Sequence, residues 1–324
     1  MKARVLGSTG IAISRVALGC GSFGGIGSPK ELVGRGLDEA ASFATMDEAV
    51  ALGINLFDTA HAYAQGASEK MIGHWLAGQP SIIRANIHLS TKVGLVITNG
   101  GRTVDLSPTS IAQQLNISLE RLGISRVDFC LCHFPDSVTP IEETLEGFAA
   151  VIEAGKAVHI GACNLSAAQL TEALAASARL GLPRYECLQN EYNLMKREDE
   201  SDVFAICQEH ALGLTPYSPM AGGILTGKYL RDQVPPPCSR VAQWPGSCLP
   251  SPKQFGAIAR LSEEAAKRGI STGAMALAWV MAHPVVVAPL AGPSRTAEHL
   301  QVAREALTIE LDAETRKQIS SSFD

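Results

Sequence analysis

The sequence has no run of lysine and arginine, and its formal net charge is −5. Proteins that bind nucleic acid usually carry a basic patch for the phosphates, so this charge gives no reason to expect a nucleic-acid partner. No apolar segment follows Lys2 and Arg4. We therefore expect no signal peptide and a cytoplasmic location.

Long uninterrupted hydrophobic runs are also missing. The most apolar stretch, 273–292, contains His283-Pro284 in its middle. Because proline interrupts a helix, this stretch predicts a helix at 274–282 followed by a buried strand at 285–288. We therefore expect no membrane-spanning segment.

The eight cysteines show neither the spacing of a metal site nor that of a disulfide framework. Such frameworks are typical of short secreted chains, whereas this chain has 324 residues. Cys130 and Cys132 have opposite strand parity to His133. If His133 points into a barrel, they face the outer helices as small hydrophobic side chains. We expect reduced thiols and no bound metal.

Strand-like and helix-like segments alternate along the chain after a short hairpin at 3–13. Eight β-then-α units favour a closed parallel (β/α)8 TIM barrel, which we expect to span 1–324 as one domain. Two loops, 21–43 and 220–252, are too long to be turns and would emerge at the carboxyl face, where such barrels bind ligands. The expected strands are 16–19, 54–57, 87–91, 127–132, 157–161, 187–189, 213–216 and 285–288, and the clearest helices are 45–52, 68–76, 108–122, 140–154 and 166–180.

A carboxylate ends the second expected strand. Asp58 shares strand parity with Ile54 and Leu56, so if these face a core, Asp58 faces it too. A buried carboxylate needs a cationic partner. Lys92, at the end of the third expected strand, can supply that charge.

Two further reactive side chains belong to the same end of the barrel. His133 closes the fourth expected strand, and Tyr63 follows Asp58 by five residues. Together with Lys92, these groups lie at or just past the carboxyl ends of three strands. That is the arrangement of a barrel active site.

The order of short motifs resembles the aldo-keto reductase family over nearly the full length of the chain. Each motif is weak alone, but eight of them occur in the family's order at the expected strand ends. The last motif is most similar to the bacterial and potassium-channel β-subunit branches. The motifs are Leu18 to Gly25, Asp58-Thr59-Ala60 with Tyr63, Gly66 to Gly73, Thr91-Lys92 with Leu131-Cys132-His133, Gly161 to Asn164, Gln189 to Asn193, Tyr217-Ser218-Pro219 and Gly222 to Tyr229.

The resemblance implies an NADPH-dependent oxidoreductase that reduces an aldehyde or ketone. Because few aromatic residues occur in the loops that would select the substrate, a sugar-like or small polar carbonyl compound is favoured over a steroid. The family's catalytic tetrad corresponds to Asp58, Tyr63, Lys92 and His133. Tyr63 would be the general acid, and Lys92 would lower the pKa of its hydroxyl. Asp58 would keep Lys92 charged and oriented. His133 would donate a hydrogen bond to the substrate oxygen.

The resemblance also implies the cofactor contacts. Asn164 and Gln189 would hydrogen-bond the nicotinamide carboxamide, and Tyr217 would stack on the ring. Ser294 and Arg295 would bind an adenosine 2′-phosphate, which favours NADPH over NADH. NADH stays possible, since the family's usual Glu-Asn pair for adenine is missing. The other expected cofactor residues are Gly21, Cys163 (where serine is usual), Ser218, Met220, Gly222, Lys228, Arg240 and Gly292.

Two other functions stay open on the sequence. One is a noncatalytic NADPH-binding subunit, which the complete tetrad argues against. The other is a Schiff-base lyase with Lys92 as nucleophile, although the adjacent Asp58 would keep that lysine protonated. A small-molecule carbonyl compound is the expected partner, and the loops 21–43, 93–105 and 220–252 would select it. The sequence does not indicate the oligomeric state.

Overall fold

The computed structural model describes residues 3–98, 101–237, 239–243, 249–293 and 300–324. Its centre is an eight-stranded sheet in the order β11-β10-β9-β8-β5-β4-β3-β12, and every neighbouring pair is parallel. The strands are β3 (Ala17–Gly19), β4 (Leu56–Asp58), β5 (His88–Val93), β8 (Val127–Cys132), β9 (Ala157–Cys163), β10 (Tyr185–Gln189), β11 (Gly213–Leu214) and β12 (Leu290–Ala291).

Backbone hydrogen bonds join the two ends of this sheet. The N–H of Val287 donates to the carbonyl oxygen of Leu214 at 2.9 Å, and that of Leu290 donates to Pro216 at 2.9 Å. The strands therefore close into the expected (β/α)8 barrel. The predicted boundary of the eighth strand is wrong. Val286 forms only an isolated bridge, and the regular strand is β12, which begins after Pro289, a residue without a backbone N–H to donate.

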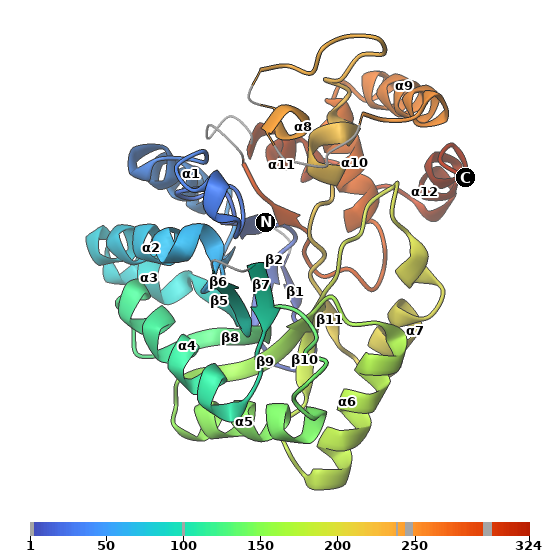
Figure 1. Cartoon of the computed structure of the whole chain (residues 1–324). Helices are drawn as coiled ribbons and strands as arrows, with labels where there is room; N and C mark the ends of the chain where they lie inside the picture. Colours follow the sequence, from blue (N-terminus) through green and yellow to red (C-terminus); the bar gives the residue numbers. More distant parts are fainter. Residues whose placement is uncertain (1–2, 99–100, 238, 244–248, 294–299) are drawn as a thin grey trace.

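Helices cover the outside of the barrel, and Figure 1 shows α2, α4, α5 and α6 following the curve of the sheet. Five of them lie where the sequence predicted amphipathic helices, α4 with the predicted bounds. In α4 the side chain of Ser107 accepts the N–H of Ser110, and Gly123 ends the helix in a left-handed conformation. The helices are α1 (Glu39–Ala51), α2 (Ala67–Gly78), α3 (Ser81–Asn86), α4 (Pro108–Leu122), α5 (Ile141–Glu153), α6 (Ala167–Leu180), α7 (Val203–Glu209), α8 (Arg240–Gln243), α9 (Pro252–Lys267), α10 (Thr272–Met281), α11 (Gln301–Ala306) and α12 (Ala313–Ser321).

Two hairpins accompany the barrel. The first, β1 (Ala3–Val5) with β2 (Ala12–Ser14), is antiparallel and was predicted. The second, β6 (Leu95–Thr98) with β7 (Gly101–Val104), lies in the loop after β5 and was not expected as strands. Through Leu95 and Ile97 of β6 and Gly101 and Arg102 of β7, this hairpin lies at the carboxyl face. Within the described residues, no helix is long and apolar enough to cross a membrane.

Alternate residues of the strands pack into two separate apolar layers. Leu56 and Leu131 belong to the cluster inside the barrel, whereas Phe57, Cys130 and Cys132 belong to the cluster between barrel and helices. The predicted orientation of the two cysteines is therefore confirmed. Ile54 is an exception, since it lies in the outer cluster. Regular strand geometry starts only at Leu56, so strand parity does not extend back to position 54.

Candidate active site

A cavity of about 1060 Å³ opens at the carboxyl ends of the strands. Every predicted site residue that the structure describes lines it, with one exception: Lys92 lies beneath its floor and is 1% exposed. Ser294 and Arg295 fall outside the described residues. The predicted residues that line the cavity are Gly21, Asp58, Tyr63, His133, Cys163, Asn164, Gln189, Tyr217, Ser218, Met220, Gly222, Lys228, Arg240 and Gly292.

The floor of the cavity holds a buried ion pair. Lys92 Nζ donates to Asp58 Oδ1 and, at 2.8 Å, to the carbonyl oxygen of Thr59. Gln189 Nε2 donates to the second carboxylate oxygen of Asp58 at 2.9 Å. Burial is the largest single influence and lowers the pKa of Lys92, but Asp58, helped by Tyr63 and Cys163, more than offsets burial, so that the pKa lies well above its ordinary value. Lys92 is therefore a fixed ammonium group.

Tyr63 lies above this pair. Its hydroxyl accepts from Lys92 Nζ at 3.4 Å, and its ring packs edge-on against His133, with the ring centroids 5.5 Å apart. Ala64 and Gln65, which follow it, both have positive φ, so the chain turns sharply to present the ring. Burial raises the pKa of Tyr63 above its ordinary value of 10, and Lys92 only partly opposes this. The predicted lowering by Lys92 is present, but it does not set the net direction.

His133 is a neutral imidazole in this site. It is 7% exposed, and burial together with the charges of Lys92 and Arg102 lowers its pKa well below 6.5. Its Nδ1 has no hydrogen-bond partner among the described residues. The Nδ1 atom is shielded from solvent, whereas the residue itself lines the cavity beside the ring of Tyr63.

These pKa shifts predict the pH profile of a reaction in which Tyr63 gives up a proton. A raised tyrosine pKa keeps the acid form dominant until the pH rises through that value, and a depressed histidine pKa keeps the imidazole neutral. We expect kcat/KM for reduction to stay level from about pH 6 to about pH 9. An inflection near the ordinary pKa of histidine, in steady-state rates over this range, would contradict the assignment.

The amide side chains on the other side of the cavity are held in place by the protein. Asn164 has a positive φ of 61°, its Nδ2 donates to the carbonyl oxygen of His133 at 2.9 Å, and its Oδ1 accepts from the Tyr217 hydroxyl at 2.8 Å. An amide has two N–H donors and two lone pairs, so each of these groups keeps capacity for a ligand. A non-glycine residue in this strained conformation is typical of a functional site.

The far end of the cavity is glycine-rich and basic. Gly222 and Gly223 have positive φ, and a Cβ atom on Gly223 would lie 2.9 Å from Lys228 Nζ. The positive φ favours glycine at both positions, and the backbone of this loop lies close to the Lys228 side chain. Arg240 lines the same end. Backbone N–H groups and cations at one end of a long cavity suit the phosphates of a dinucleotide.

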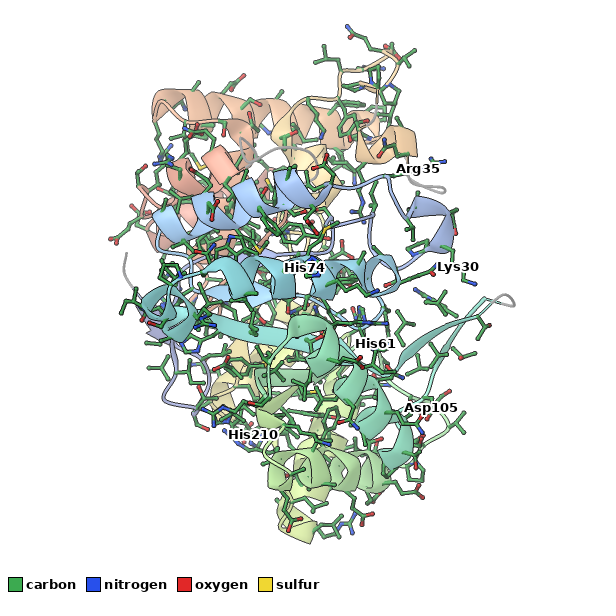
Figure 2. All side chains as sticks on the ribbon, turned by 90° about the vertical axis from the view of Figure 1, so that its left-hand side faces the viewer. Lys30, Arg35, His61, His74, Asp105 and His210 are labelled. Atoms are coloured by element: carbon green, nitrogen blue, oxygen red, sulfur yellow. The ribbon has the colours of Figure 1, made fainter. Side chains whose placement is uncertain are left out.

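The sequence did not reveal the polar network behind the Tyr63 loop. Arg121, on α4, donates to the carbonyl oxygen of His61 at 2.9 Å and to the buried carboxylate of Glu69 at 2.9 Å. Glu69 also accepts from the hydroxyl of Thr91 at 2.7 Å. His61 is labelled in Figure 2. Glu69 belongs to a motif, but nothing in the sequence pairs it with an arginine 52 residues away.

No group of three or more histidine, cysteine or acidic side chains that could hold a metal ion occurs in the described part of the chain. The described cysteines Cys20, Cys130, Cys132, Cys163, Cys187 and Cys207 are free and buried.

Comparison with known proteins gives a consistent result. The model of the "Aldo/keto reductase family" matches residues 15–323. The uncharacterized oxidoreductase YrpG of Bacillus subtilis (strain 168) is 31% identical over 100% of this chain and 96% of its own length. A probable voltage-gated potassium channel subunit beta of Oryza sativa subsp. japonica is 32% identical over 91% of this chain and 88% of its own. The structure of a glycerol dehydrogenase from Gluconobacter oxydans superposes with a TM-score of 0.83 at 26% identity, covering 99% of this chain and 94% of that one.

Proposed function

Because the chain belongs to the aldo/keto reductase family of NAD(P)H-dependent oxidoreductases, we propose that it reduces an aldehyde or ketone to an alcohol with NADPH. The observation that carries this proposal is the position of Lys92 between Asp58 and Tyr63 at the floor of the cavity. A hydroxyl held by an ammonium group, next to a neutral imidazole, is a site for protonating an oxygen atom. NADPH, when bound, supplies the hydride.

In the proposed mechanism the substrate oxygen lies between Tyr63 and His133. The hydroxyl of Tyr63 gives its proton to this oxygen as the carbonyl carbon is reduced, and the neutral imidazole of His133 donates a hydrogen bond to the same oxygen. Lys92 stabilises the tyrosinate that is left. Asp58 holds Lys92 charged and aimed at the phenol. Solvent then returns the proton to Tyr63.

The donor set fits the proposed cofactor. Asn164 and Gln189 would hold the nicotinamide carboxamide, and Tyr217 would pack against the ring. Cys163 lines the same wall, where a thiol is a weaker hydrogen-bond donor than serine. Gly21, Ser218 and Met220 would close around the nicotinamide and pyrophosphate. Gly222, Lys228, Arg240 and Gly292 would hold the pyrophosphate and the adenosine side.

Two observations argue against the other candidate functions. A Schiff-base nucleophile must be a neutral amine, whereas Asp58 raises the pKa of Lys92 and burial keeps it away from a substrate. A noncatalytic NADPH-binding subunit would not need a phenol, an ammonium and an imidazole directed to one point. The likeness to a potassium channel subunit beta makes this second candidate worth testing.

We expect NADPH to bind more tightly than NADH. Gly292 and Pro293 line the adenosine end of the cavity, and Ser294 and Arg295 follow them directly in the chain. Replacing Arg295 with alanine removes the proposed charge-assisted contact to the 2′-phosphate. The difference in binding free energy between NADPH and NADH should then shrink by about 1.5–3 kcal/mol. Fluorescence titrations of both cofactors measure this, with Arg126→Ala as a control for net charge. Equal affinities of the unaltered protein for NADPH and NADH would contradict the assignment of Ser294 and Arg295 to the 2′-phosphate.

The direct test of the proposed function is oxidation of NADPH in the presence of aldehydes, ketones, keto-sugars and quinones. We expect turnover with a subset of these compounds and formation of the matching alcohol. Tight NADPH binding with no turnover across the whole set would favour the noncatalytic subunit.

A further inference from the structure

Arg102 lines the outer end of the cavity, next to the catalytic side chains. Arg102, on β7, places its guanidinium carbon 5.1 Å from the ring centroid of Phe134. Phe134 in turn stacks on His133, with the centroids 5.0 Å apart and the planes 15° from parallel. Phe134 therefore contacts both the guanidinium of Arg102 and the imidazole of His133, which brings Arg102 close to the catalytic side chains.

Arg102 has no carboxylate partner within ion-pair distance in the part of the chain that the structure describes. Two acids of the neighbouring loops, Asp105 and Asp136, accept hydrogen bonds elsewhere. Asp105 accepts from the N–H of Ser107 at 2.9 Å, and Asp136 accepts from Leu106, Val138 and Thr139. Arg102 nevertheless lines the cavity together with Phe134 and His133.

The charged side chains that line this end of the cavity are Lys30, Glu31 and Arg102, which gives an excess of one positive charge. Lys30 and Glu31 come from the loop after β3. Figure 2 shows Lys30 on the same side of the molecule as the β6–β7 hairpin, whose base is marked by Asp105.

The contact with the Phe134 ring does not use an N–H donor of the guanidinium in a hydrogen bond to a side-chain oxygen. The N–H donors lie in the plane of the guanidinium, so the edge stays available for a ligand, and the forked geometry matches a carboxylate or a phosphate. The wall beside it is apolar. Ile97 pairs directly with Arg102 across the hairpin, and Leu95 has the same parity as Ile97. Both line the cavity.

We propose that the substrate is a short aldehyde or ketone with a carboxylate or phosphate group, which binds Arg102 while the carbonyl oxygen lies between Tyr63 and His133. Leu95 and Ile97 contact the carbon chain that joins the two groups. This inference rests on the proposed function and narrows the sugar-like or small polar carbonyl compound expected from the sequence to one that carries an anionic group.

The test compares matched pairs of aldehydes with the NADPH-loaded protein. We expect kcat/KM for 4-oxobutanoate to exceed that for butanal, or kcat/KM for glyceraldehyde 3-phosphate to exceed that for glyceraldehyde, by roughly tenfold or more at low ionic strength. The pair with the larger ratio identifies carboxylate or phosphate as the natural group. Because a charge contact is screened, the ratio should fall as salt is added, which a purely steric preference would not do.

The variant Arg102→Met should lower the ratio of kcat/KM for the anionic aldehyde to kcat/KM for its neutral partner by roughly tenfold or more. The variant Arg102→Lys should restore part of this ratio. Arg126→Met is the matched control. It removes the same charge from an exposed position before β8, at the opposite end of the barrel, and should keep the native ratio. Reduction of the neutral aldehydes without any anion preference, or a preference unaffected by Arg102→Met, would overturn the inference and leave the proposed function standing. Failure to reduce any of the aldehydes, ketones, keto-sugars and quinones would overturn the proposed function as well.

Discussion

Replacing Tyr63 with phenylalanine is expected to abolish most carbonyl reduction while leaving NADPH binding intact. The change deletes the hydroxyl that Lys92 Nζ contacts at 3.4 Å and keeps the ring that packs on His133. General acid catalysis contributes about 10²–10⁴-fold, so kcat should fall by at least that factor. Steady-state rates and a cofactor titration on the same preparation measure both quantities.

A second tyrosine provides the matched control for this variant. Tyr185 is also buried, but it packs in the cluster between barrel and helices and does not line the cavity. Tyr185→Phe should therefore keep turnover close to native. Native activity in Tyr63→Phe, with any substrate that the unaltered protein reduces, would rule out Tyr63 as the proton donor.

Replacing Lys92 with methionine is expected to affect both stability and catalysis. It leaves Asp58, 1% exposed, without its counter-charge. Breaking a buried ion pair by removing one partner costs about 3–5 kcal/mol, so the free energy of unfolding should fall by that amount. Reduction should be lost, because the ammonium that contacts the Tyr63 hydroxyl is gone. Denaturant titration and steady-state rates measure the two effects.

The pattern across related variants separates a catalytic pair from a structural one. Asp58→Asn should be milder, since Lys92 still faces the phenol. Asp58→Asn combined with Lys92→Met should recover part of the stability but none of the turnover. Arg184→Met is the control: it breaks the pair with Glu186 at 3.3 Å, in the first half of β10 and away from the cavity, and should leave turnover unchanged. A folded Lys92→Met protein that still reduces substrate would contradict the account.

The sequence predicted those parts of the site that depend on strand periodicity. Asp58, Lys92 and His133 end consecutive strands of one parallel sheet, so their convergence follows from the barrel, and the motif order added Asn164, Gln189 and Tyr217. The parity argument placed Ile54 on the same face as Leu56, which is wrong, because regular strand geometry begins two residues after Ile54. These predictions needed only local pattern and topology.

Other features could not be predicted because they depend on tertiary packing. The contact of Arg121 with His61 and Glu69 joins segments separated by more than fifty residues, and arginine has no pattern that names its partner. The position of Arg102 required the β6–β7 hairpin, which the sequence predicted only as part of the loop 93–105. The direction of the pKa shift of Tyr63 depends on burial, which raises the pKa, and on the charge of Lys92, which lowers it. Both influences depend on the three-dimensional structure.

The most direct test of the account is to follow deuterium from cofactor to product. The reaction is run with an aldehyde substrate and NADPH that carries deuterium at both C4 positions of the nicotinamide, and the alcohol is analysed by mass spectrometry. We predict one deuterium on the former carbonyl carbon for the unaltered protein, and little or no labelled alcohol in the same time for Tyr63→Phe despite bound cofactor. Alcohol without deuterium, or equal labelled product from both proteins, would contradict the claim that this cavity reduces a carbonyl with a proton from Tyr63.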